Sequence, residues 1–295
     1  MVSSDVFLLV PSSTSAFWGP RPSSPVGASL FYWFISMLNN TTLNAIKSIA
    51  ISAGQKIMEI YQRDFETYEK DDKSPLTEAD LAAHKLICAS LAEQFPEVPI
   101  LSEESSGIEY SDRKSWETFW LVDPLDGTKE FVKKNGEFTV NIALIHQGKP
   151  VLGVVYAPAL DTTYAGVEGL GAYKESKGQQ QVISVLNEVP DSWVLVGSRS
   201  HRGEAMDAYL EKFSSYEFIS KGSSLKLCMV AEGAAHLYPR LGPTSEWDTA
   251  AADAVVRAAG GVVADIEGNA LQYNKEDILN PWFMVHGKDV DVPKV

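Results

Sequence analysis

Hydrophobic and polar positions predict alternating helices and strands along most of the chain. LNAIKSIAISAGQKIMEIYQRDF places apolar residues at helical spacing, which predicts a helix over residues 41–64. A similar segment predicts a second helix over 77–95, which Pro96 ends. VPILSEES and WETFWLVD are short apolar runs that finish in acids, and each is typical of a strand that leads into a polar loop.

The rest of the chain is richer in short strands. Residues 138–174 contain β-rich runs separated by Gly and Pro, which predicts an antiparallel meander. Further on, WVLVGS, EFIS, HLYPR and GGVVAD are typical of strands, and helices are predicted between them at 203–213, 222–233 and 245–259. This pattern predicts a mixed α/β (α+β) protein. We divide it into an N-terminal α+β half at 37–185 and a C-terminal α/β half at 186–295.

Residues 1–36 differ from the remainder, because they are rich in Ser and Pro and nearly uncharged. The apolar run 26–38 is too short to span a bilayer, and the region lacks the basic start and the cleavage site of a signal peptide. We interpret 1–36 as a disordered extension, or as upstream sequence read in frame before a start at Met37. A membrane-surface anchor is the less favoured interpretation.

Charge narrows the choice of partners. The 295 residues carry 39 acids and 25 bases, a formal net charge of −14, which disfavours a nucleic-acid polymer as partner. Cys88 and Cys228 lie far apart in predicted helices and are expected to be buried free thiols. The five histidines are scattered and no CxxC, HExxH or Walker A motif occurs, so a zinc site is disfavoured.

The segment FWLVDPLDGTKEF, residues 119–131, carries the strongest chemical signal. Its apolar run leads directly into Asp123 and Asp126, and carboxylates beside a buried strand cost free energy unless something compensates them. Mg²⁺ prefers oxygen ligands and is a suitable compensator. Two acids three residues apart, on a chain that turns at Pro124, can point at one centre, and the Leu125 carbonyl can add a neutral ligand.

The next residues suit a phosphate. Gly127 allows backbone N–H groups to approach an anion, a helix that begins there would attract phosphate, and the Thr128 hydroxyl can orient a water. These are the components of metal-assisted phosphate-ester hydrolysis. The D-P-L-D-G-T spacing differs from the D-x-D-x-T of aspartyl-nucleophile phosphatases. Direct attack by a metal-bound hydroxide is therefore favoured over a covalent aspartyl-phosphate.

Four other acids have simpler explanations when each is taken alone. Glu103 and Glu104 follow a predicted strand, where acids are commonly solvated. Asp80 and Asp248 begin predicted helices, and each stands three residues after a threonine or serine, as in a capping box. By itself, capping is the favoured interpretation for both.

ILSEES, WLVDPLDGTKEF and EWDTAAADAVVRAAGG, in this order, resemble the inositol monophosphatase superfamily of Mg²⁺-dependent, lithium-sensitive phosphatases. Within it, DKSPLTEAD, DPLDGTKEF and GSSLKLCMVAEGAAHLYPRLGPTSEWDTAAADAV resemble the bacterial-type 3′(2′),5′-bisphosphate nucleotidases. The similarity covers roughly residues 41–288. It implies a layered αβαβα sandwich of the inositol monophosphatase and fructose-1,6-bisphosphatase type.

The resemblance also implies roles. It assigns two or three Mg²⁺ ions to Glu103, Asp123, the Leu125 carbonyl, Asp126 and Asp248, with Asp80 at a further, weaker site through water. It makes Glu103, Thr128 and Asp126 catalytic, and Glu103 and Thr128 would hold and activate the attacking water; Glu104 would lie outside the ligand set. The implied substrate-binding residues are Glu103, Leu125, Asp126, Gly127, Thr128, Gly222, Ser223 and Asp248, of which Gly127 and Thr128 would bind the scissile phosphate through backbone N–H groups.

The implied substrate is adenosine 3′,5′-bisphosphate, a by-product of sulfate assimilation, which would yield AMP and phosphate in the cytoplasm. Similar proteins attach peripherally to the inner membrane, although no segment here demonstrates such contact. Candidate contacts to the second phosphate or ribose, each also explicable as a solvated base, are Arg199, His201, Lys221, Lys226 and Arg240. Gly222 and Ser223 are stronger candidates, as a pair that opens a predicted helix, whereas Trp247 is expected to brace Asp248 by packing.

Two alternatives stay open. Inositol monophosphate or fructose 1,6-bisphosphate would use the same metal ligands, so only the C-terminal half distinguishes them. A nucleotide- or metal-binding regulator without turnover is the second alternative. It is less favoured, because none of the motif residues Glu103, Asp123, Asp126, Thr128 and Asp248 is missing.

Overall fold

The computed structural model describes residues 34–69, 75–105, 107–198 and 203–295. Leu38–Val295 form one compact unit, which contains all the sheets and the cavity described for this chain. Most of the predicted extension, residues 1–36, lies outside the described residues. No helix in the described ranges combines the length and apolar composition that crossing a bilayer requires.

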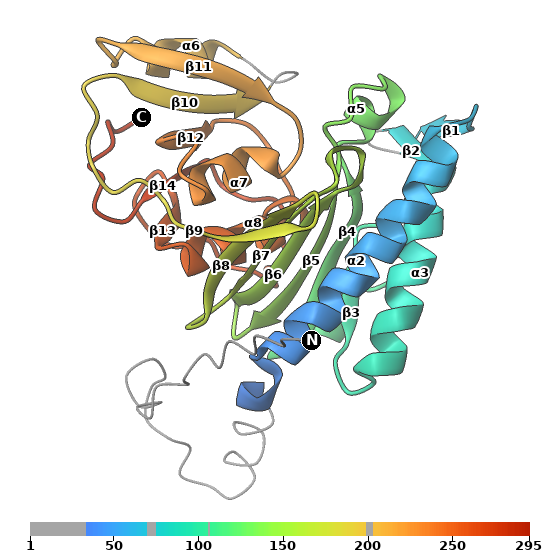
Figure 1. Ribbon diagram of the computed structural model, residues 1–295. Helices are drawn as coiled ribbons and strands as arrows, with labels where there is room; N and C mark the ends of the chain where they lie inside the picture. Colours follow the sequence, from blue (N-terminus) through green and yellow to red (C-terminus); the bar gives the residue numbers. More distant parts are fainter. Residues whose placement is uncertain (1–33, 70–74, 106, 199–202) are drawn as a thin grey trace, which may run out of the picture. The chain divides into compact units, whose positions relative to one another are not determined.

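The larger sheet has seven strands, which neighbour one another in chain order (Figure 1). Its first two strands are parallel and every later neighbouring pair is antiparallel, which confirms the meander predicted over 138–174 and extends it by one strand at each end. The strands are β3 (Ile100–Ser102), β4 (Thr118–Asp126), β5 (Thr139–His146), β6 (Lys149–Ala157), β7 (Thr162–Val167), β8 (Gly171–Ser176) and β9 (Gln179–Ile183).

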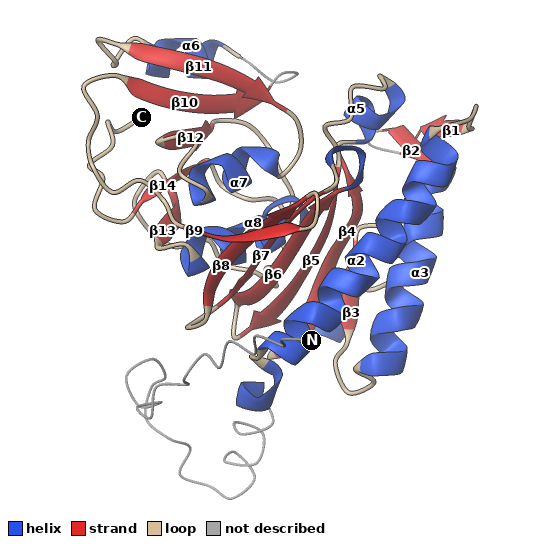
Figure 2. Ribbon diagram, in the orientation of Figure 1, coloured by secondary structure: helices blue, strands red, loops and turns tan. Residues whose placement is uncertain are grey.

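Two long helices cover one face of this sheet (Figure 2): α2 (Asn40–Tyr61) and α3 (Glu78–Gln94). The opposite face packs on α8 (Glu246–Ala258). Helix α2 ends three residues before the predicted boundary. Just beyond its end, the Arg63 guanidinium pairs with the Glu78 carboxylate at 2.8 Å.

A smaller, five-stranded sheet has the order β11-β10-β12-β14-β13. The strands of the two sheets come from separate parts of the chain. The division of the chain into two halves at residue 185 stays a prediction. The sequence pattern does not predict strand β14, because a short apolar run near the chain end carries no alternation that separates it from a loop. The strands are β10 (Trp193–Ser198), β11 (Tyr216–Lys221), β12 (Leu237–Arg240), β13 (Gly261–Asp265) and β14 (Phe283–Gly287).

Helices α7 (Leu225–Ala231) and α8 lie between the two sheets, and α6 (Glu204–Leu210) packs on the far side of the smaller sheet (Figure 1). The expected five-layer αβαβα arrangement is thereby confirmed. Helix α7 begins three residues later than predicted, so Gly222 and Ser223 lie in the turn before it and do not open the helix. Both cysteines are free, as expected; Cys228 is buried, whereas Cys88 is only half-buried.

Short elements complete the unit. The hairpin of β1 (Thr67–Glu69) and β2 (Pro75–Thr77) precedes α3, and α4 (Tyr110–Arg113) precedes β4. Helix α5 (Thr128–Val132) begins directly after the DPLDG segment, as predicted. A single 3₁₀ turn, η1 (Pro158–Leu160), separates β6 from β7.

Two glycines on adjacent strands determine how closely α8 approaches the larger sheet. Gly153 and Gly166 are paired in register between β6 and β7. A Cβ on Gly153 would lie 2.1 Å from the Ala251 carbonyl oxygen, and one on Gly166 would lie 2.9 Å from the Ala258 Cβ. The alanine-rich face of α8 therefore rests almost directly on the strand backbones, and this contact places the N-terminus of α8 beside β4.

We expect Gly153→Ala to lower the free energy of unfolding by about 1–3 kcal/mol, because the added methyl group must push α8 away from the sheet. Urea or thermal unfolding measures the loss. Gly242→Ala is the control, since a Cβ there meets no atom within 4 Å. Equal stability of the two variants would contradict the close-packing argument.

Candidate metal centre and active site

Three carboxylates from two elements converge at one point. Asp123 and Asp126 come from β4 and Asp248 comes from the first turn of α8, and one oxygen of each lies within 4.8 Å of the others. Asp123 is buried, while Asp126 and Asp248 are half-buried. The structure thus brings together acids that are more than a hundred residues apart in the sequence.

The shape of β4 makes this convergence possible. In a regular strand, residues three apart point to opposite faces of the sheet. The register of β4 against β5 shifts between Asp123 and Asp126, as in a bulge, and the Leu125 N–H bonds to Asp123 Oδ1 at 3.0 Å. The sequence pattern places both acids after the strand, whereas the structure places this irregularity inside it. The bulge turns both carboxylates toward one side.

Glu103 joins the cluster from the end of β3. Its N–H donates to the Val122 carbonyl at 3.0 Å, which fixes the residue beside β4. Burial raises the pKa of Asp123 well above its usual range, and the charges of Glu103, Asp126 and Asp248 raise it further, as does a hydrogen bond with Glu103. Burial, followed by Asp126 and Glu103, raises the pKa of Asp248 to about 8.

This concentration of oxygen ligands and negative charge fits Mg²⁺. Carboxylates packed this closely repel one another, and a divalent cation relieves both the repulsion and the cost of burial. The donor set contains oxygen only, as Mg²⁺ prefers. The ligand role of each individual residue stays a proposal.

Both capping explanations from the sequence hold, and they are compatible with a functional role. Asp248 Oδ2 accepts from the Ser245 N–H at 2.8 Å, and Asp80 Oδ2 accepts from the Thr77 N–H at 2.8 Å. In each carboxylate, Oδ2 serves the cap. Asp80 Oδ1 accepts from the Thr128 hydroxyl at 3.3 Å, so the structure places Asp80 against Thr128.

The turn after the acids is tightly packed. Gly127 has a left-handed backbone with φ of 91°, and a Cβ there would lie 3.1 Å from the Glu137 carbonyl oxygen and 3.3 Å from the Ser223 Cβ. The Thr128 hydroxyl lies 3.4 Å from the Leu125 carbonyl oxygen. Gly127 therefore permits two turns, one from each sheet, to meet beside the carboxylate cluster.

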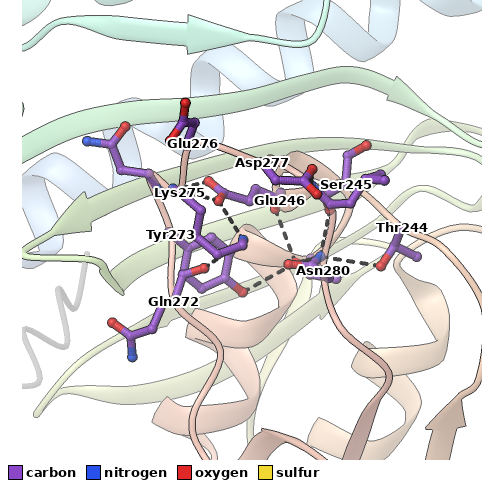
Figure 3. A network of polar contacts seen from close by, with 12 residues as sticks. Thr244, Ser245, Glu246, Gln272, Tyr273, Lys275, Glu276, Asp277 and Asn280 are labelled. Atoms are coloured by element: carbon purple, nitrogen blue, oxygen red, sulfur yellow. Dashed lines mark hydrogen bonds and ion pairs between the residues drawn. The ribbon is translucent and has the colours of Figure 1, made fainter. Parts of the chain in front are cut away.

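Sequence reasoning missed Glu246, which anchors the N-terminus of α8 (Figure 3). Its side chain is fully buried, Oε1 accepts from the Lys275 N–H at 2.9 Å and from Lys275 Nζ at 2.6 Å, and Oε2 accepts from the Asn274 N–H at 2.7 Å. Asn280 Nδ2 also donates to the Ser245 carbonyl at 2.8 Å. The only sequence signal for this role is that Glu246 directly precedes Trp247 and Asp248. Its partners lie 28 and 29 residues away, so no local pattern points to them.

A cavity of about 420 Å³ opens beside the acids. Two predicted bases, Lys226 and Arg240, line it, whereas Lys221 pairs with Glu137 at 3.2 Å. Arg199 and His201 lie outside the described residues. The lining comprises Asp126, Gly127, Thr128, Lys129, Glu130, Ser198, Gly222, Ser223, Lys226, Leu227, Tyr238, Arg240, Pro243, Thr244, Ser245, Asp248, Thr249, Leu279 and Phe283.

The polar atoms of this lining suit an anionic ligand. The Ser223 hydroxyl and Arg240 Nε are buried without a hydrogen-bond partner among the described residues. Burial lowers the pKa of Lys226 to about 8, and Asp126 opposes that shift. Burial raises the pKa of Asp126, and Lys226 opposes that shift in turn. Trp247 packs against the core, and its bracing of Asp248 stays a prediction.

Comparison with known proteins identifies the family. The model of the inositol monophosphatase family matches residues 38–287. The chain belongs to the inositol monophosphatase family. The sequence resemblance is thereby confirmed.

Several members of the family are similar over nearly their whole length. The 3′(2′),5′-bisphosphate nucleotidase CysQ of Salmonella typhimurium is 50% identical over 246 residues, which cover 82% of this chain and 98% of the relative. The protein of the same name from Escherichia coli K12 is 48% identical with equal coverage. A crystal structure of CysQ from Bacteroides thetaiotaomicron is 44% identical, with a TM-score of 0.75 over 84% of this chain and 97% of that chain.

The pKa values of the metal-free site link stability to pH. The carboxyl of Asp248, with its pKa raised to about 8, stays protonated in the folded chain at pH values where the unfolded chain ionises it. A group with a raised pKa favours folding at low pH, and that contribution disappears as the pH rises from about 4 to about 8. Each such group contributes about 1.4 kcal/mol per pH unit at most. We expect the metal-free protein to lose stability between about pH 5 and about pH 8.

Thermal unfolding in EDTA and in Mg²⁺ tests this expectation at both pH values. Mg²⁺ should raise Tm more at the higher pH, because the site then holds carboxylates that bind the cation. Asp248→Asn should reduce both the pH dependence and the effect of Mg²⁺, since its amide does not titrate. A Mg²⁺-induced shift of equal size at both pH values would contradict the electrostatic account.

Proposed function

We propose that this chain is a Mg²⁺-dependent phosphatase that removes the 3′-phosphate of adenosine 3′,5′-bisphosphate to give AMP and phosphate. The observation that carries this proposal is the position of the carboxylate cluster at the rim of a cavity that also contains two cations, Lys226 and Arg240. The CysQ relatives are named as 3′(2′),5′-bisphosphate nucleotidases, which supports the same reaction.

The cluster offers ligands for two or three Mg²⁺ ions. Family resemblance and the donor chemistry support five Mg²⁺ ligands: Glu103, Asp123, the Leu125 carbonyl, Asp126 and Asp248. Asp80 would contribute through water. When bound, Mg²⁺ neutralises phosphate charge, lowers the pKa of a water and stabilises the leaving oxygen.

The chain's own residues orient the reaction. Glu103 accepts a proton from the attacking water, and the Thr128 hydroxyl, held by Asp80, helps to orient that water. The backbone N–H groups of Gly127 and Thr128 bind the oxygens of the scissile phosphate. The Ser224 N–H donates to Asp126 Oδ2 at 2.6 Å, and this bond holds the Asp126 carboxylate in position to bind Mg²⁺.

The second phosphate and the ribose are bound in the same cavity, beside the carboxylates. Lys226 and Arg240 supply positive charge, and the Ser223 hydroxyl supplies a hydrogen bond. Gly222, whose N–H donates to Glu137 Oε2 at 2.9 Å, lines the cavity beside Ser223. A cavity of about 420 Å³ is within the range of pockets that hold small organic ligands. Two cations in the cavity, in addition to the metal ions, favour a substrate with two anionic groups over inositol monophosphate.

Fructose 1,6-bisphosphate also has two phosphates and stays an alternative substrate. A regulator without turnover is less favoured, because all the assigned ligands are present and three of them, Asp123, Asp126 and Asp248, converge. The cytoplasmic location and the peripheral contact with the inner membrane follow from the sequence resemblance and stay predictions.

A substrate panel tests the assignment directly. We expect phosphate release to be fastest with adenosine 3′,5′-bisphosphate, compared with inositol 1-phosphate and fructose 1,6-bisphosphate at equal concentration. Release should require Mg²⁺ and decrease when Li⁺ is added. Faster release from either sugar phosphate would exclude the nucleotide as the preferred substrate, and binding without release would favour a regulator.

Asp126→Asn tests the metal ligands. We expect phosphate release to fall by more than about 100-fold, since loss of an outer partner of a ligand already costs roughly 10–100-fold. The fold should persist, because the amide keeps the size of the side chain and removes a buried charge. Circular dichroism and Tm in EDTA provide the control. Activity restored at saturating Mg²⁺ would count against Asp126 as a direct ligand.

A further inference from the structure

Ser224 contacts more of the metal-binding apparatus than any sequence motif suggested. It lies in the turn before α7 with 1% of its surface exposed, and its side chain does not cap that helix. Its hydroxyl oxygen lies 3.0 Å from Asp126 Oδ2, 2.7 Å from the Asp248 backbone carbonyl oxygen and 2.9 Å from Asn141 Nδ2. One buried hydroxyl therefore touches both residues that face each other across the site.

The hydrogen bonds of this hydroxyl can be counted. A serine hydroxyl has one proton and two lone pairs. The Asn141 amide donates to one lone pair, so the proton points to the other side, toward either the Asp126 carboxylate or the Asp248 carbonyl. The Ser224 N–H also donates to Asp126 Oδ2, at 2.6 Å, so Asp126 is held even when the hydroxyl proton goes to the Asp248 carbonyl.

Asn141 is suited to orient Ser224. It is buried on β5, directly opposite Asp123 in the register of β4 and β5. Its Nδ2 donates to the Ser224 hydroxyl, whereas its Oδ1 has no hydrogen-bond partner among the described residues. A buried amide retained in a strand of mostly apolar residues is costly, which points to a role at the site.

We propose that Ser224 is a positioning residue of the metal centre, oriented by Asn141. Its hydroxyl joins Asp126, on the larger sheet, to the first turn of α8, which carries Asp248. Through these contacts it sets the distance between two cation-binding carboxylates. The inference rests on the proposed function, because it deepens the assignment of Mg²⁺ to these residues.

Isothermal titration with Mg²⁺ alone tests the inference without substrate. We expect Ser224→Ala to bind Mg²⁺ about tenfold more weakly than the unaltered chain, as loss of a hydrogen-bonded partner of a ligand typically does. Phosphate release should need correspondingly more Mg²⁺, while KM for the nucleotide at saturating Mg²⁺ stays unchanged. The neighbouring variant Ser223→Ala is the matched control, and it should raise KM while leaving Mg²⁺ affinity unchanged.

A double variant separates positioning from stability. Ser224→Ala leaves the Asn141 amide buried without an acceptor and should lower Tm in EDTA. Asn141→Leu combined with Ser224→Ala removes both polar groups, so Tm should recover while Mg²⁺ affinity stays low. The double variant also carries the test if the single variant does not fold.

Three results would overturn the inference. The first is a Mg²⁺ affinity of Ser224→Ala equal to that of the unaltered chain. The second is a Mg²⁺ affinity of the double variant that recovers together with its Tm. Either result would leave the proposed function standing. Failure of the unaltered chain to bind Mg²⁺ would overturn the proposed function and this inference with it.

Discussion

The repulsion among four carboxylates is the constraint on which the site depends. Glu103, Asp123, Asp126 and Asp248 are held so close together that burial and mutual charge raise the pKa of Asp123 and Asp248 far from their usual range. A divalent cation would relieve this repulsion, so a fold that imposes the arrangement favours binding one.

The packing around α8 imposes the arrangement. Its alanine face rests on the glycines of β6 and β7, its first turn is anchored by the buried Glu246, and its Asp248 carbonyl meets Ser224. These contacts come from both sheets, so Asp248 is positioned by elements that share no local sequence. The same carboxylates also serve the fold, since one oxygen of Asp80 and one of Asp248 cap helices.

The distribution of charge explains how a protein with a net charge of −14 can take an anionic ligand. Bound Mg²⁺, as proposed, would partly offset the acids of the site, and Lys226 and Arg240 add positive charge within the cavity. Lys226 lies near Asp126, and each opposes the pKa shift that burial imposes on the other. Local charge at the cavity therefore matters more for this ligand than the sum over the surface.

Hydrophobic periodicity by itself determined most helices, the meander and the mixed α/β class, because the spacing of apolar residues reflects which face of a helix or strand is buried. The DPLDGT segment likewise determined that metal and phosphate chemistry belong together. Only the tertiary structure decided that a bulge turns Asp123 and Asp126 to one side, that Glu246 binds a segment 28 residues away, and that Ser224 lies between two acids. Such contacts join residues distant in sequence, and no local pattern encodes the packing that brings them together.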